Sequence, residues 1–212
     1  MIWRVNELRK KSHISLAAYL IDSMRVDGLK EHKKAFYLGS ILPDCLPSFI
    51  TRKHNIQETF DILREEIRSI TEDYDTERGM NGYFCRHLGV VTHYVADYFT
   101  FPHNHTFEGT MREHCAYEKE LKHVFKEYVH SEEAVRIREK NGTFTTVEEI
   151  CRFIKKMHEE YLSAIKVVKE DCMYIVELCH RVVDAILQIF ELKQTEIRKL
   201  KMQRVRVPAV VA

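Results

Sequence analysis

The sequence predicts an all-α protein folded as a single multi-helix bundle, and three observations support this. Apolar residues recur at intervals of three and four along most of the chain, which is the spacing of one helix face. Only 7 Gly and 4 Pro interrupt it, fewer than the turns of a β-sandwich need. The 212 residues lie within the usual size of one domain. We therefore expect one helical domain over residues 1–203 and a disordered tail over residues 204–212.

The expected helices follow from apolar periodicity and from the residues that interrupt it. The first begins at Ser12, ends near residue 28 and carries His13 on its inward face. The second ends at Pro43, because proline cannot continue a helix, and Asp44 therefore lies in a loop. Further helices are expected over about 57–75, 83–100, 107–128, 145–168 and 171–199.

Composition and charge exclude several classes of function. The 33 basic and 32 acidic residues nearly cancel, so binding to nucleic acid is not favoured. No apolar run reaches the ~18 residues of a membrane span, and the charged first residues lack the apolar stretch of a secretory signal. The six cysteines form no CxxC pair and are expected as reduced thiols. These observations predict a cytoplasmic protein.

The helix expected over residues 83–100 carries a candidate metal clamp. His93 and Asp97 are four residues apart, which places an imidazole and a carboxylate on one face. The small residues Gly89 and Ala96 flank them, and we expect this to leave room for ions. A proline then ends the helix and turns His103 back toward the clamp.

A second clamp follows on the next expected helix. His114 and Glu118 repeat the four-residue spacing, so the two clamps and His103 together offer five nitrogen and oxygen ligands. Zinc accepts such ligands at about 2 Å. A single His and Glu pair at this spacing is common on solvated helices. Two pairs with a histidine between them are much harder to explain by chance.

These residues form a motif that resembles the zinc-binding signature of bacterial zinc-dependent phospholipases C, shared in outline with P1/S1-type nucleases. The motif reads His93-Tyr-Val-Ala-Asp97-Tyr-Phe-Thr-Phe-Pro-His103-Asn, followed by His114-Cys-Ala-Tyr-Glu118. The likeness extends upstream, in the same order, to His13, to Asp44 in the segment Gly-Ser-Ile-Leu-Pro-Asp, and to His54. It covers residues 1 to about 120, and the remainder agrees only in being helical.

The resemblance implies the helical fold of the phospholipase C and P1 nuclease superfamily and a centre of two or three zinc ions. The expected ligands fall into three sets: Asp44, His54, His93 and Asp97; His103, His114 and Glu118; and His13 with Asp97 as a bridge. Neighbouring divalent ions polarise a phosphoryl group and lower the pKa of a bound water. Asp44, as a ligand or as the general base to that water, is the expected proton-handling carboxylate.

The start of the chain departs from the family pattern. In secreted members, a tryptophan at the mature N-terminus completes the third zinc site, whereas here Met1 and Ile2 precede Trp3. Three alternatives follow: the third site has different ligands, the enzyme works with two metal ions, or the site is partly lost. The expected cytoplasmic location also makes phosphatidylcholine a hazardous substrate.

The remaining histidines are expected outside this centre. His87, six residues before His93, points away from it on the same helix. His105 competes with His103, but the family spacing selects His103. His180 beside a cysteine is expected to pack in the ordinary way. We expect four further histidines to be solvated: His32, His123, His130 and His158.

The expected function is therefore hydrolysis of a phosphodiester or phospholipid-like substrate, with peripheral membrane contact as an option. A P1/S1-like nuclease is one alternative, although the balanced charge argues mildly against it. A non-catalytic helical protein stabilised by zinc is the other, although structural zinc sites prefer thiolates and this set has none. HD-type phosphohydrolases are excluded, because the chain contains no His-Asp dipeptide.

Overall fold

The protein is all-α, as predicted, with no strand among the residues that the structure describes. This structure is a computed structural model and describes residues 2–45, 53–139 and 144–206, with side chains from residue 10 to residue 203. The α-helices are α1 (Ile2–Met24), α2 (Asp27–Glu31), α3 (Lys33–Ile41), α5 (Ile56–Ile70), α6 (Gly82–Tyr98), α7 (Met111–Tyr128), α8 (Val147–Ser163) and α9 (Val168–Arg206). Short 3-10 turns are η1 (Leu42–Asp44), η2 (Thr76–Arg78), η3 (Phe101–His103) and η4 (Glu132–Ala134).

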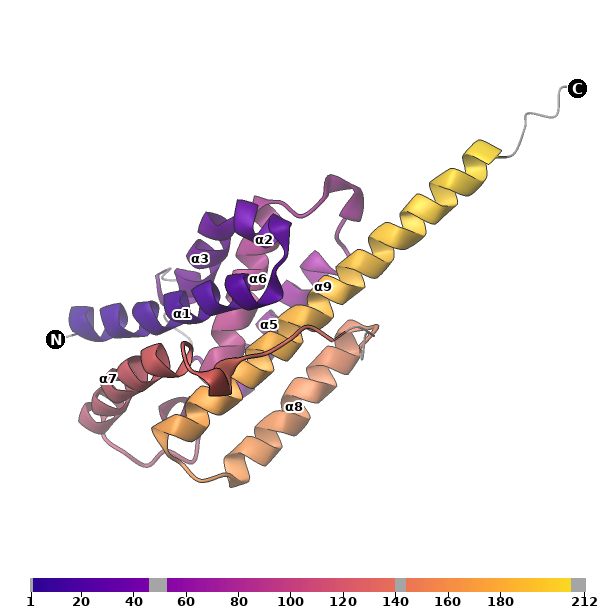
Figure 1. The fold of residues 1–212 in the computed structure, drawn as a ribbon. Coiled ribbons are helices and arrows are strands. Elements are labelled where there is room, and N and C mark those ends of the chain that lie inside the picture. Colours follow the sequence, from indigo (N-terminus) through magenta and orange to yellow (C-terminus); the bar gives the residue numbers. More distant parts are fainter. Residues whose placement is uncertain (1, 46–52, 140–143, 207–212) are drawn as a thin grey trace, which may run out of the picture.

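Helix α6 lies at the centre of the bundle. Every residue from Leu88 to Tyr98 is buried, as expected of a helix that is apolar on all sides. It packs against α3, α5, α9 and α1 (Figure 1). Because the buried stretch includes His93 and Asp97, the fold carries two polar residues into its interior.

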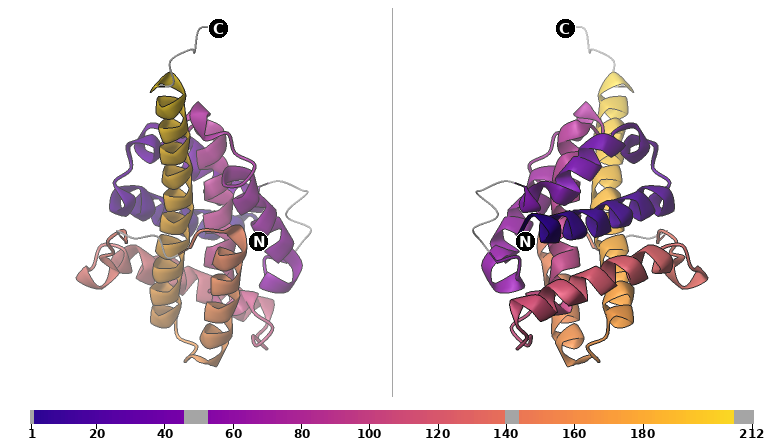
Figure 2. Two further views of the ribbon diagram at one scale, coloured as in Figure 1. Left: turned by 90° about the vertical axis from the view of Figure 1, so that its right-hand side faces the viewer. Right: turned by 90° about the vertical axis from the view of Figure 1, so that its left-hand side faces the viewer.

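Helix α9 forms the long spine of the molecule. Helix α8 runs beside α9 (Figure 1). The C-terminal part of α9 extends beyond the other helices. Helices α1 and α7 pack against each other and run across α9 in Figure 2. The first half of α9 therefore closes one side of the core, against α6 and α7.

A pair of glycines lets α3 and α6 approach closely. A Cβ on Gly39 would lie 1.9 Å from the carbonyl oxygen of Arg86, and one on Gly89 would lie 2.4 Å from that of Phe36. Both distances are too short for any side chain. The expectation that Gly89 leaves room for ions is therefore wrong, because the space beside it is filled by the backbone of α3.

Several helix boundaries differ from those expected. The second expected helix, which ends at Pro43, is divided at His32 into α2 and α3, and the helix expected to reach residue 75 ends at Ile70. Helix α7 starts after Thr110, which forms a capping box with Glu113. A second capping box, formed by Thr146 and Glu149, starts α8 at Val147, and this helix ends at Ser163, so it is shorter at both ends than the helix expected over 145–168.

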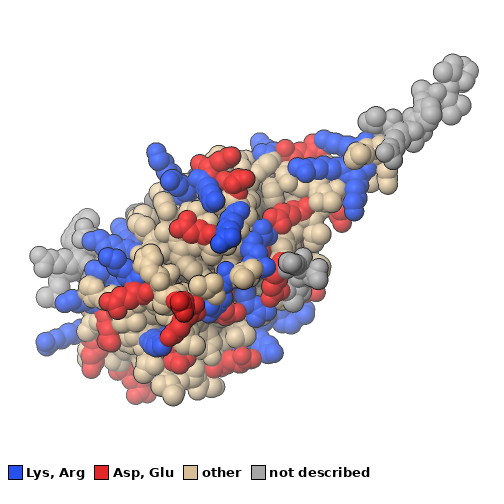
Figure 3. All heavy atoms as spheres, in the orientation of Figure 1, with Lys and Arg blue, Asp and Glu red and all other residues tan. Residues whose placement is uncertain are grey.

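The C-terminal helix is longer than expected. It continues to Arg206, so the first three residues of the expected tail are helical, and residues 207–212 lie outside the described residues. No helix among the described residues has the length and apolar character needed to cross a membrane. All six cysteines are free thiols, as expected. Cys45 is exposed. Lys and Arg alternate with Asp and Glu over the face shown in Figure 3, without a large area of one sign.

Candidate metal centre

The structure brings all eight residues predicted as metal ligands into one buried region. They come from α1, η1, the segment before α5, α6, η3 and α7. Three groups, of which the first two share His93, each have ligand atoms within 4.8 Å of one another: His13, His93 and Asp97; Asp44, His54 and His93; and His103, His114 and Glu118. Residues up to 105 positions apart in the sequence thus meet, since the first is His13 and the last is Glu118 (118 − 13 = 105).

Asp97 is at the middle of this region and faces four histidines. Its Oδ1 lies 3.3 Å from His13 Nε2. Its Oδ2 lies 2.9 Å from His54 Nδ1 and 3.3 Å from His93 Nε2. The same oxygen is 3.5 Å from His103 Nδ1. With its two oxygens facing different histidines, this carboxylate is placed as a bridge between sites.

The orientation of His93 is set by helix α3. Its Nδ1 is 2.9 Å from the carbonyl oxygen of Ser40, an acceptor, so Nδ1 carries the proton and donates to it. Its Nε2 then faces Asp97 and lies 3.1 Å from His54 Nδ1. A backbone carbonyl that fixes the tautomer of a histidine is a regular feature of metal sites. The close approach of α3 and α6 at Gly39 and Gly89 places that carbonyl within reach.

The third group is built on the first turns of α7. His114 Nε2 lies 2.8 Å from Glu118 Oε1, as the four-residue spacing predicts. His103, from η3, places its Nε2 3.3 Å from the same oxygen. The His114 side chain retains 14% of its exposure, against 6% for His103 and 5% for Glu118. The region is therefore nearest to solvent at His114.

Burial and neighbouring charges shift the pKa values of three of these groups. Burial lowers the pKa of His13, and His93 beside it acts in the same direction, so the His13 imidazole is neutral at pH 7. Burial would raise the pKa of Asp97, but His103 and His93 hold it well below its usual range. Burial would lower the pKa of His93, but Asp97 and Asp44 together raise it. The carboxylates of Asp97 and Asp44 thus both stabilise a positive charge at the position of His93.

One buried oxygen indicates that the donor set fits a metal ion. Asp44 is 5% exposed, and its Oδ2 has no hydrogen-bond partner among the described residues. Its Oδ1 faces His54 Nδ1 at 3.8 Å. Burying a carboxylate oxygen without a partner costs free energy unless a cation compensates it. The imidazole and carboxylate donors are those that zinc accepts.

A small cavity of about 40 Å³ adjoins the centre. Its lining combines the candidate ligands His13, Asp97, His103 and Glu118 with apolar side chains from α1, α7 and α9. Ala96 is among the lining residues, in agreement with the expectation that a small residue leaves space there. This volume holds roughly one to three water-sized groups.

Four other predictions concern residues outside the centre. His87 pairs with Glu66 and does not join the groups around Asp97. His105 is exposed, and His103 occupies the position that the family spacing selects. His180 is buried in the helical core. The side chain of Trp3 lies outside the described residues.

The expectation that His158 is solvated is wrong. It is 3% exposed and its Nε2 lies 2.7 Å from Asn104 Oδ1. The sequence held a signal for this burial, because His158 falls four residues after Ile154 and three before Tyr161, both fully buried. Its charged neighbours concealed that stripe.

An all-α fold that gathers histidines and carboxylates in three groups supports the general zinc hydrolase kind. Residues 12–166 match the family described as "Zinc dependent phospholipase C". The chain therefore belongs to the zinc-dependent phospholipase C family. All eight candidate ligands lie within the matched segment. No match was found among curated proteins, and none among solved structures.

Proposed function

We propose that this protein is a zinc-dependent hydrolase that cleaves a phosphodiester, with a phospholipid-like molecule as its substrate. The observation that carries the proposal is the meeting of eight imidazole and carboxylate side chains, Asp97 among them, in a member of this family. Asp44, His54, His93 and Asp97 would hold one ion, and His103, His114 and Glu118 a second. His13 and Asp97 would hold a third.

Zinc bound in these sites would polarise the phosphoryl oxygens and lower the pKa of a water molecule. The protein's own part is to orient the substrate and to accept a proton. Asp44, as a ligand or as the general base, would take the proton of the attacking water, and its buried Oδ2, without a partner among the described residues, supports this role. Hydrolysis consumes that water and yields an alcohol and a phosphomonoester.

The test is a metal count by inductively coupled plasma mass spectrometry, made beside assays on bis-p-nitrophenyl phosphate and phosphatidylcholine. His93→Ala and Glu118→Ala should each reduce both the zinc count and the activity. His87→Ala is the matched control, because His87 is on α6 like His93 but pairs with Glu66 outside the centre. It should retain both.

The same experiment separates the alternatives. Activity on single-stranded nucleic acid in preference to the two esters would identify a P1/S1-like nuclease. Bound zinc with no turnover of any of the three substrates would identify a zinc-stabilised helical protein. Folded protein that takes up no added zinc would refute the proposal.

A further inference from the structure

A fully buried carboxylate lies in the first turn of α9, outside the segment that matches the family. Asp171 is 0% exposed. Its Oδ2 accepts hydrogen bonds from the backbone N–H of Phe101 and from the hydroxyl of Tyr117, both at 2.8 Å. Its Oδ1 accepts one from the hydroxyl of Tyr161 at 2.6 Å. Three donors on one buried side chain are enough to fix its position.

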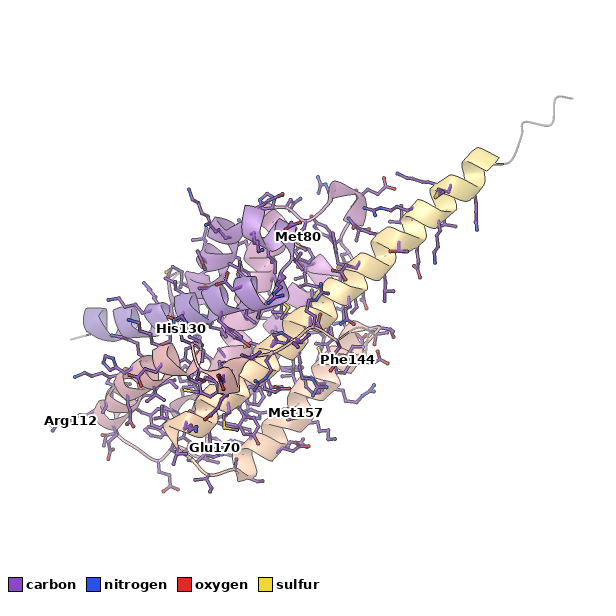
Figure 4. The ribbon with its side chains drawn as sticks, viewed as in Figure 1. Met80, Arg112, His130, Phe144, Met157 and Glu170 are labelled. Carbon is purple, nitrogen blue, oxygen red and sulfur yellow. The ribbon has the colours of Figure 1, made fainter. Side chains whose placement is uncertain are left out.

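Two of these three donors adjoin candidate metal ligands. Phe101 begins η3, the turn that ends at His103, and Tyr117 directly precedes Glu118 on α7. Asp171 Oδ2 therefore joins the segment that carries His103 to the helix turn that carries Glu118. Figure 4 shows the neighbouring Glu170 at the base of α9, between α7 and α8.

The C-terminal end of η3 is also fixed by hydrogen bonds. Asn104, the residue after His103, donates from Nδ2 to the carbonyl oxygens of Tyr98 at 3.1 Å and Thr100 at 2.9 Å. Its Oδ1 accepts from His158 on α8. His103 thus lies between two anchored points, of which Asp171 is the one that also reaches α7.

We infer that Asp171 is a positioning residue for the metal group formed by His103, His114 and Glu118, a role that rests on the function proposed above. The 3.3 Å approach of His103 Nε2 to Glu118 Oε1 depends on the relative position of η3 and α7. Asp171 fixes that relative position from a third helix. Helix α9, beyond the matched residues 12–166, thereby completes the metal centre.

The test compares four variants that remove different parts of this arrangement. Asp171→Ala removes all three hydrogen bonds. Asp171→Asn keeps one oxygen, which can accept from Phe101 and Tyr117 while the amide N–H₂ faces the Tyr161 hydroxyl oxygen. Tyr117→Phe removes the bond beside Glu118. Tyr161→Phe is its matched control, since it removes an equivalent bond that leads away from the centre.

Zinc affinity is measured by competition with a chelator, together with the number of ions bound. Asp171→Ala should lower the affinity for one zinc ion by about tenfold or more, which is the usual effect of losing a residue that supports a metal ligand. Asp171→Asn should restore that affinity, and Tyr117→Phe should weaken it more than Tyr161→Phe does. In a Glu118→Gln background, Asp171→Ala should have no further effect, because the same ion is already lost. Thermal unfolding in chelator reports whether each variant folds.

Distinct outcomes overturn the two proposals separately. Wild-type protein that binds no zinc refutes the proposed function and, with it, this role. Wild-type protein that binds zinc, with equal affinity in Asp171→Ala, refutes only the role of Asp171. If Asp171→Ala does not fold, the two tyrosine variants decide, and equal zinc affinity in both contradicts the inference.

Discussion

His54 Nδ1 lies 2.9 Å from Asp97 Oδ2, although 43 residues separate the two in the sequence. His54 comes from the segment before α5, and Asp97 from the last turn of the buried helix α6. The same carboxylate also faces His13 and His103. Asp97 therefore faces histidines of all three groups, whereas the contacts of Glu118 with His103 and His114 lie within one group.

This difference predicts unequal effects of two neutral variants. Asp97→Asn should remove more than one zinc ion per chain, because its oxygens face histidines of more than one group. Glu118→Gln should remove a single ion. The metal count of purified protein checks both, and equal losses would contradict the bridging position of Asp97.

The contact of α3 with α6 predicts a steric penalty at Gly89. Gly89→Ala should lower the free energy of unfolding by about 1–3 kcal/mol, because the added methyl group meets backbone that cannot move aside easily. It should also weaken zinc binding, since separating the helices moves the Ser40 carbonyl away from His93. Gly82→Ala is the control on the same helix, where a Cβ meets only Ala35 at 3.9 Å. The measurement is urea unfolding in chelator, and the free energy of unfolding of Gly82→Ala should be close to that of the wild type.

Burial of His158 predicts an acid-dependent loss of stability. Burial lowers its pKa to about 4 from the ordinary 6.5, so between these values the unfolded chain binds the proton more readily than the folded protein. Stability from this group is complete above pH 6.5 and is lost as pH falls toward 4. The loss by pH 5 is about 2 kcal/mol at about 1.4 kcal/mol per pKa unit.

His158→Gln should remove this dependence while leaving an amide N–H₂ that can donate to Asn104. The measurement is the free energy of unfolding at pH 7 and pH 5 in chelator, for wild type and variant. The difference between the two pH values should be smaller in the variant. An unchanged difference would show that His158 titrates normally in the folded protein.

A partly buried ion pair predicts an effect on stability at Arg138. Its Nε donates to Asp184 Oδ1 at 2.6 Å, and Asp184 is only 3% exposed. Arg138→Met should cost about 2 kcal/mol, because it removes a charge-assisted hydrogen bond from a buried carboxylate that keeps its bonds from Glu139 N–H and Gln188 Nε2. Adding Asp184→Asn should recover part of the loss. Lys156→Met, at a pair with Glu160 on the surface of α8, should change stability by less than about 1 kcal/mol.

The sequence predicted the part of the centre that lies within single helices. His93 with Asp97 and His114 with Glu118 are paired by helix geometry alone, and the structure places both pairs as expected. The order of the remaining residues, matched to a family signature, indicated which histidines join them. Fold class followed from the period of the apolar residues.

What the sequence could not predict are contacts between helices. Gly89 resembles a residue that leaves space, and only the position of α3 shows that the space is filled. Asp171 resembles an ordinary acidic residue in the first turn of a helix, and nothing in the sequence links it to Tyr117, 54 residues earlier. Such pairs become visible only when the helices are packed.

The position of Asp171 also bears on the order in which the molecule is made. A ribosome delivers His13, His54 and the whole of α6 long before it reaches α9. The group around His93 can therefore gather while synthesis continues, whereas η3 and α7 wait for the carboxylate that joins them. With the proposed role of Asp171, the group of His103, His114 and Glu118 would gain this link only after α9 has emerged and packed against α7.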